Sequence, residues 1–93
     1  MSIHVARIFY NFFMGDINML KIRDIREDKD LTQKQISQVL NCTQQTYSRY
    51  ETGEITIDIN SIIKLAKFYN TSTDYLLGLT NEIKPYPRRN KSY

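Results

Sequence analysis

The chain has 93 residues, with 13 lysines and arginines against 10 aspartates and glutamates, one cysteine and one histidine. This length holds one small domain, and the single cysteine, Cys42, excludes an internal disulfide. With His4 as its only histidine, the chain is not expected to hold a metal or to be an enzyme, and we expect no cofactor. The apolar run near the N-terminus is too short to cross a bilayer and lacks a signal-peptide cleavage site, so we expect a cytoplasmic protein without a membrane segment.

The composition divides the chain into three parts. Residues 1–18 form an apolar, aromatic extension, residues 19–79 show helical periodicity, and residues 80–93 form a basic tail with Pro85 and Pro87. All of the excess positive charge lies in the tail, which we expect to be disordered. A polyanionic partner is therefore allowed by the charge balance but not required by it.

The extension leaves several alternatives open. Its apolar residues recur at helical spacing, and such a face is not expected to stay exposed in a stable monomer. It could pack on the domain, mediate dimerisation, or precede the native start, since Met14 and Met19 are alternative initiators.

Start and stop signals for short helices follow one another in the middle part. Asn18 can cap a first helix that ends near Asp30. Thr32 and Gln35 fit a capping box at the start of a second helix. Asn41 ends that helix, because asparagine tolerates the left-handed conformation that follows many helices.

Thr43 caps a third helix at once, so that the second and third helices form a helix-turn-helix. A fourth helix runs from its cap Asp58 to Asn70, and a short fifth helix begins at Ser72 and ends before Gly78. The side chains expected in the core from the last two helices are Ile59, Ile62, Ile63, Ala66, Tyr69, Tyr75, Leu76 and Leu77. The expected fold is all-α, with five short helices around one core.

Three segments together resemble a known family. The run from Leu31 to Gly53 reads LTQKQISQVLNCTQQTYSRYETG, and it is followed by IIKLAKF at 62–68 and DYLLG at 74–78. Over residues 19–79 the chain resembles the Cro/cI-type helix-turn-helix family, also called the XRE family, of transcriptional regulators. The resemblance implies a lambda-repressor-like DNA-binding domain, binding to a double-stranded operator as a homodimer, and transcriptional repression in the cytoplasm at the nucleoid.

The third helix carries the side chains that we expect to contact DNA bases. At about 100° per residue its polar side chains share one arc, while Tyr47 and Tyr50 point away. A glutamine can pair bidentately with adenine, and an arginine can bind guanine or a phosphate. The resemblance places this arc in the major groove. The side chains expected to contact bases are Gln44, Gln45, Ser48 and Arg49, and those expected to contact phosphates are Thr32, Gln33, Thr43 and Thr52.

The resemblance also implies an ion pair between Arg26 and Glu51 that ties the third helix to the scaffold. Two features depart from the family pattern. Asp30 stands where the family usually has glycine, and residues 54–57 offer no cation to a phosphate, a lack for which the basic tail could compensate. The alternative function is a protein-interaction module, in which the same domain binds a protein partner as an antitoxin or partner-binding regulator does.

Overall fold

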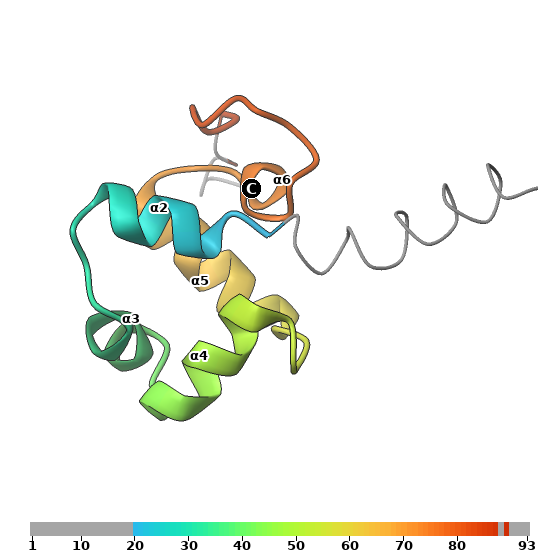
Figure 1. The fold of residues 1–93 in the computed structure, drawn as a ribbon. Helices are drawn as coiled ribbons and strands as arrows, with labels where there is room; N and C mark the ends of the chain where they lie inside the picture. Colours follow the sequence, from blue (N-terminus) through green and yellow to red (C-terminus); the bar gives the residue numbers. More distant parts are fainter. Residues whose placement is uncertain (1–19, 88, 90–93) are drawn as a thin grey trace, which may run out of the picture.

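The computed structural model describes residues 20–87 and 89, and within this part the chain forms five helices and no strand. The all-α fold expected from the sequence is confirmed. The helices are α2 (Ile22–Asp28), α3 (Gln33–Val39), α4 (Gln44–Thr52), α5 (Ile59–Tyr69) and α6 (Thr73–Leu76) (Figure 1). The extension at residues 1–18, including His4 and Asn18, lies outside the described residues.

Side-chain caps begin four of these helices. The Thr32 hydroxyl accepts a hydrogen bond from the Gln35 backbone N–H at 3.1 Å, and the Thr32 N–H donates to the Gln35 side chain at 2.8 Å, which completes the capping box. Thr43, Asp58 and Ser72 accept equivalent bonds at the starts of α4, α5 and α6. All four caps were predicted from the sequence and are confirmed.

The first described helix differs from its expected bounds. It begins at Ile22 after Lys21, which provides no side-chain cap, rather than just after Asn18. It ends at Asp28, because Lys29 and Asp30 form a turn in which Asp30 takes φ 56°. Asp30 thus adopts the left-handed conformation for which the family usually provides glycine.

Two more helices are followed by asparagines in the same conformation. Asn41 has φ 55° after α3, and Asn70 has φ 54° after α5. Asparagine is one of the few residues with a side chain that visits this region routinely, so these positions end their helices sharply, as predicted.

Buried side chains from every described helix meet in one core. Its members are Ile22, Ile25, Ile36, Leu40, Tyr47, Ile57, Ile62, Leu65, Ala66, Tyr69 and Leu76. The prediction was wrong for three residues expected in the core: Ile59 is 74% exposed, and Ile63 and Leu77 are also exposed. Ile62 and Leu65 lie on the same side of α5, and this side faces the core. Ile59 and Ile63 therefore point outward. The core residue Leu65 was not expected from the sequence.

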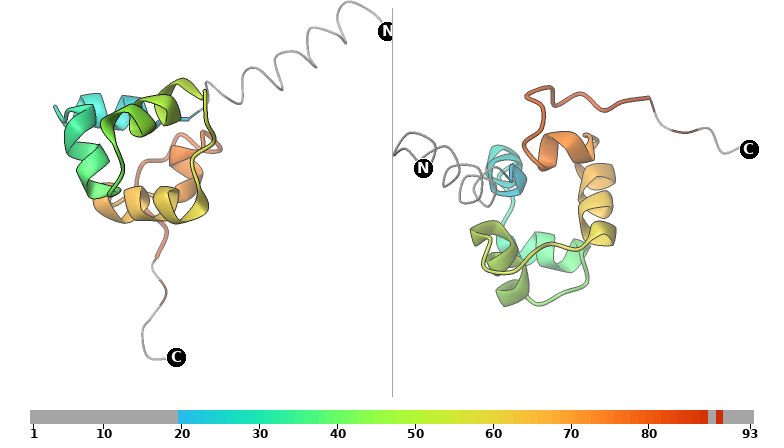
Figure 2. Two further views of the ribbon diagram at one scale, coloured as in Figure 1. Left: turned by 90° about the horizontal axis from the view of Figure 1, so that it is seen from below. Right: turned by 90° about the vertical axis from the view of Figure 1, so that its right-hand side faces the viewer.

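The domain formed by these helices has two distinct ends. Helices α3 and α4 lie at one end, and α6 lies at the opposite end (Figures 1 and 2). The start of α2 is fixed to α6, because the Lys21 N–H donates a hydrogen bond to the Leu76 carbonyl at 2.8 Å.

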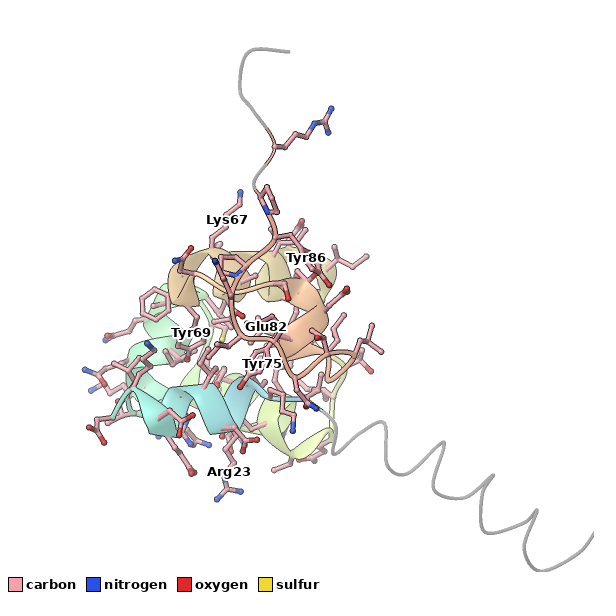
Figure 3. The ribbon with its side chains drawn as sticks, turned by 90° about the horizontal axis from the view of Figure 1, so that it is seen from above. Arg23, Lys67, Tyr69, Tyr75, Glu82 and Tyr86 are labelled. Carbon is pink, nitrogen blue, oxygen red and sulfur yellow. The ribbon has the colours of Figure 1, made fainter. Side chains whose placement is uncertain are left out.

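The chain after α6 folds back on the domain. The Thr71 hydroxyl donates a hydrogen bond to the Ile83 carbonyl, and the Tyr86 hydroxyl donates to Asp74 at 3.0 Å. Figure 3 shows Tyr86 beside α5 and α6, at the end of the domain away from α4. Residues 80–87, expected to be disordered, therefore pack against the domain. Of the remaining tail only Arg89 is described.

Candidate nucleic-acid interface

A short, well-packed turn joins α3 to α4. Leu40 and Ser37 are buried beside it, and the Ser37 hydroxyl donates a hydrogen bond to the Lys34 carbonyl at 2.7 Å. The Cys42 N–H donates to the Ser37 carbonyl at 2.9 Å, while Asn41 supplies the left-handed turn. These contacts fix the direction of α4 relative to α3. Burial raises the pKa of the Cys42 thiol, which opposes formation of a reactive thiolate.

The outer side of α4 forms a single polar surface. Four side chains of α4 line one shallow, open depression together with Gln33 of α3 and Glu54 of the following turn: Gln44, Gln45, Ser48 and Arg49. Gln44, Gln45 and Arg49 are exposed and Ser48 is half-buried. The structure therefore brings together all four residues that the sequence analysis expects to contact bases. We call this surface the α4 face.

The inner side of α4 is anchored by two residues one turn apart. Tyr47 is fully buried in the core, and the Glu51 side chain is only 3% exposed. Burial and the nearby Glu51 carboxylate raise the pKa of Tyr47 above its usual range, so this residue stays a neutral phenol. Helix α4 thus has one side for packing and another for solvent or a ligand.

Arg26 and Glu51 form a bidentate ion pair. The Arg26 Nε and Nη2 atoms donate to the two Glu51 carboxylate oxygens at 2.6 and 3.1 Å. A third donor of Arg26, Nη1, bonds to the Leu31 carbonyl at 2.8 Å. This is the ion pair that the resemblance implies, and it joins α2 to α4.

Glu51 has a further partner that the sequence analysis missed. The Gln33 side-chain amide donates at 3.0 Å to Glu51 Oε1, the oxygen that also accepts from Arg26 Nη2. One carboxylate therefore links α2, α3 and α4. Burial alone would raise the pKa of Glu51, but the hydrogen bonds from Arg26 and Gln33 outweigh burial and hold the pKa below its ordinary value. Glu51 is therefore charged at neutral pH and is bound as a carboxylate.

The four residues expected to contact phosphates already make bonds within the domain. The hydroxyls of Thr32 and Thr43 accept the capping bonds, and the Thr52 hydroxyl donates to the Arg49 carbonyl at 3.1 Å. The Gln33 side chain binds Glu51. The hydroxyls of Thr32 and Thr43 also donate, to the side chains of Gln35 and Thr46. All four residues lie around α3 and α4 at the same end of the domain.

Glu54 also lines the α4 face, and it is not among the site residues expected from the sequence. Its carboxylate lies 3.6 Å from Arg49 Nε. The signal was present in the sequence, because Gly53 ends α4 in the left-handed conformation at φ 77° and a turn there brings the next residue back beside the last turn of the helix.

The described part of the chain contains neither a candidate metal site nor a candidate membrane span. Among residues 20–87 and 89, no group of histidine, cysteine, aspartate or glutamate side chains could hold a metal ion. Over the same residues, none of the helices has the length and apolar character needed to span a membrane.

Comparison with known proteins identifies a matching family and several relatives. A helix-turn-helix family model matches residues 22–76. The uncharacterized HTH-type transcriptional regulator YobD of Bacillus subtilis (strain 168) is 29% identical over 69 residues, which is 74% of this chain and 62% of YobD. The HTH-type transcriptional regulator ImmR of the same organism is 36% identical over 58 residues, which is 62% of this chain and 46% of ImmR.

A phage protein is similar over a shorter stretch. The cryptic phage CTXphi transcriptional repressor RstR of Vibrio cholerae is 39% identical over 49 residues, which is 53% of this chain and 44% of RstR. The chain thus spans roughly half of the length of these relatives. No solved structure matches the chain significantly.

The ion pair predicts that Arg26 is far more important for stability than its neighbour Arg23. Replacing Arg26 with alanine leaves the buried Glu51 carboxylate without its main partner and should lower the free energy of unfolding by about 3–5 kcal/mol. Arg23→Ala is the matched control, because Arg23 forms an exposed pair with Glu27 on the same helix and should change stability little. Urea unfolding of both variants measures the difference. Equal losses in the two variants would contradict the role given to Arg26.

The lowered pKa of Glu51 predicts a specific acid dependence. A carboxylate whose pKa lies below its ordinary value of 4.5 in the folded state stabilises the fold fully above that value, and this contribution disappears as the pH falls through the folded pKa. Glu51→Gln lacks this titration. The difference in free energy of unfolding between the parent and this variant should therefore be largest at neutral pH and shrink in acid. Unfolding curves at a series of pH values down to about pH 3 measure it, and a difference independent of pH would refute the prediction.

Proposed function

This chain belongs to the Cro/cI-type helix-turn-helix family of transcriptional regulators, and on that basis we propose that it binds a double-stranded DNA operator as a homodimer and represses transcription. The members of this family are regulators and not enzymes. Repression is supported by the similarity to RstR, which is named as a transcriptional repressor. A dimer bound at a promoter would block access to it.

The observation that carries the proposal is the division of α4 into an anchored side and an exposed polar side. Tyr47 and Glu51 hold the helix, while Gln44 and Gln45 extend from its first turn into the α4 face. A recognition helix enters the major groove with its N-terminal residues nearest the bases. The amides can then pair with the N6 and N7 edge of adenine, and Arg49 can pair with guanine.

The flanking polar residues are assigned to the DNA backbone. We assign Thr32, Gln33, Thr43 and Thr52 to phosphates, because they lie on α3 and at the two ends of α4. Such contacts fix the position and register of the domain without reading sequence. The internal bonds of their side chains limit how many donors they offer, which favours specificity carried by the α4 face.

The first part of the tail, residues 80–87, is placed unfavourably for a direct contact with the same DNA. Residues 80–87 pack at the α6 end of the domain, opposite α3 and α4 (Figures 1 and 3). Lys84 is therefore remote from the α4 face. We assign Lys84 a long-range electrostatic contribution, which is weaker and more sensitive to salt than a phosphate contact.

Homodimer formation is supported by apolar side chains that the core does not use. Ile59 and Ile63 lie one turn apart on the same side of α5 and are 74% and 39% exposed. Neighbouring apolar side chains left in solvent are typical of a protein–protein contact. Two copies related by a two-fold axis would present two α4 faces to two half-sites.

The first test separates sequence reading from charge attraction. Gln44→Ala and Gln45→Ala each remove groups that can pair with a base edge, so each should weaken binding to the preferred operator by about 1–3 kcal/mol and leave binding to unrelated DNA unchanged. The operator is first obtained by selecting bound sequences from a random duplex pool. Gln38→Ala is the matched control, because Gln38 is exposed on α3 but does not line the α4 face. If both variants bind both DNAs as the parent does, the protein-interaction alternative takes precedence.

The second test concerns the oligomeric state. The selected operator should contain two inverted half-sites whose centres lie about 34 Å apart, or a multiple of this distance, because each copy reads one turn of the duplex. Equilibrium sedimentation of the protein with and without the operator measures the number of copies bound. Monomers in both conditions would refute the homodimer. Removing residues 1–18 then shows whether the extension is needed for association.

A further inference from the structure

One ion pair lies within the α4 face itself. The Glu54 carboxylate lies 3.6 Å from Arg49 Nε, and the two side chains are 64% and 45% exposed. Both residues line the same depression as Gln44, Gln45 and Ser48. An acidic side chain in a surface offered to DNA is unfavourable for general affinity, because it repels phosphates at every sequence. Its presence there needs an explanation in terms of specificity.

The geometry of the pair leaves the outer end of Arg49 available. The closest approach of the pair is between a Glu54 carboxylate oxygen and Arg49 Nε, and neither Nη1 nor Nη2 of Arg49 donates a hydrogen bond within the described residues. Guanine presents two acceptors, O6 and N7, in the major groove, and an arginine binds them with two parallel N–H donors. An arginine whose Nε faces a carboxylate is biased toward making that bidentate contact with its Nη donors.

The backbone around Glu54 is fixed by the end of α4. Gly53 takes the left-handed conformation, and the Glu54 N–H donates a hydrogen bond to the Thr52 hydroxyl at 3.3 Å. The Ile55 N–H donates to the Arg49 carbonyl at 3.4 Å, and Ile57 is buried in the core. The turn therefore holds Glu54 beside Arg49, so that the pair does not depend on a chance encounter of two long side chains.

We propose that Glu54 is a specificity-determining residue that positions Arg49 for one guanine of the operator and opposes contacts between Arg49 and phosphates. This inference rests on the proposed DNA-binding function and names a role within the same site. Glu54 acts in two ways. It reduces the freedom of the guanidinium before binding, which favours the bidentate base contact. It also places a negative charge where a phosphate would otherwise compete for Arg49, which lowers affinity for all other sequences.

The expected effects are modest because both side chains are largely exposed. Glu54→Gln should weaken binding to the preferred operator by roughly two- to fivefold, in line with the strength of exposed ion pairs. The same variant should bind unrelated duplex more tightly than the parent does. If the released Arg49 contacts one phosphate, the slope of log affinity against log salt on unrelated DNA should become steeper by about 0.9.

The experiment compares three variants with the parent on three duplexes. The variants are Glu54→Gln, Arg49→Lys and the combination of both, and the duplexes are the selected operator, the operator with the Arg49-dependent guanine replaced, and an unrelated sequence. That guanine is identified by repeating the random-pool selection with Arg49→Lys: it is the operator position at which this variant no longer prefers guanine. Glu82→Gln is the matched control, because it removes the same charge at the α6 end of the domain, away from the α4 face (Figure 3).

The proposal requires Glu54→Gln to relax the same base position as Arg49→Lys and to have no further effect on discrimination in the Arg49→Lys background. Glu82→Gln should leave discrimination unchanged. A Glu54→Gln variant that behaves like Glu82→Gln, or that weakens all DNAs equally, overturns the positioning role while leaving the proposed function intact. A parent without any preferred sequence overturns the proposed function and this inference together.

Discussion

The carboxylate of Glu51 is the contact on which the geometry of the helix-turn-helix depends. An isolated helix as short as α4 is not stable in water, so its position has to come from tertiary contacts. Arg26 from α2 and Gln33 from α3 both donate to Glu51, and Arg26 also binds the carbonyl of Leu31 before α3. Burying a charge is costly, and it is compensated here because the oxygens of the carboxylate are matched by donors. Directional bonds of this kind fix the angle of a helix more strictly than apolar packing alone does.

Tyr47 adds the apolar half of the same anchor. It is fully buried one turn before Glu51, and burial also raises the pKa of its neighbour Tyr69, to about 12. Both phenols therefore stay neutral beside the ion pair, which limits the number of charges that the core has to accommodate. The outer residues of α4 contribute nothing to this arrangement. The side chains of Gln44, Gln45 and Ser48 are thus presented by a scaffold to which they make no hydrogen bond within the described residues.

Local signals explain how much of the structure could be predicted from the sequence. The caps at Thr32 and Thr43 and the asparagine at 41 depend on neighbouring residues alone, and each lies where it was expected. The facing of α5 was not predicted fully, because the isoleucines at its start offered two overlapping apolar stripes and only tertiary packing selects the one that contains Leu65. The packing of residues 80–87 was missed for a related reason. Its two hydrogen bonds join the tail to Thr71 and Asp74, and composition carries no information about such pairings.

The separation between the two sides of α4 has an evolutionary consequence. Gln44, Gln45 and Ser48 make no side-chain hydrogen bond within the described residues, whereas Glu51 can change only together with its partners on α2 and α3. Substitutions on the outer side therefore escape the purifying selection that acts through folding stability. Under the proposed function, a lineage of such regulators can exchange one operator for another by single substitutions on an unchanged scaffold. Duplicated copies in one genome could diverge in this way until each ignores the promoters of the other.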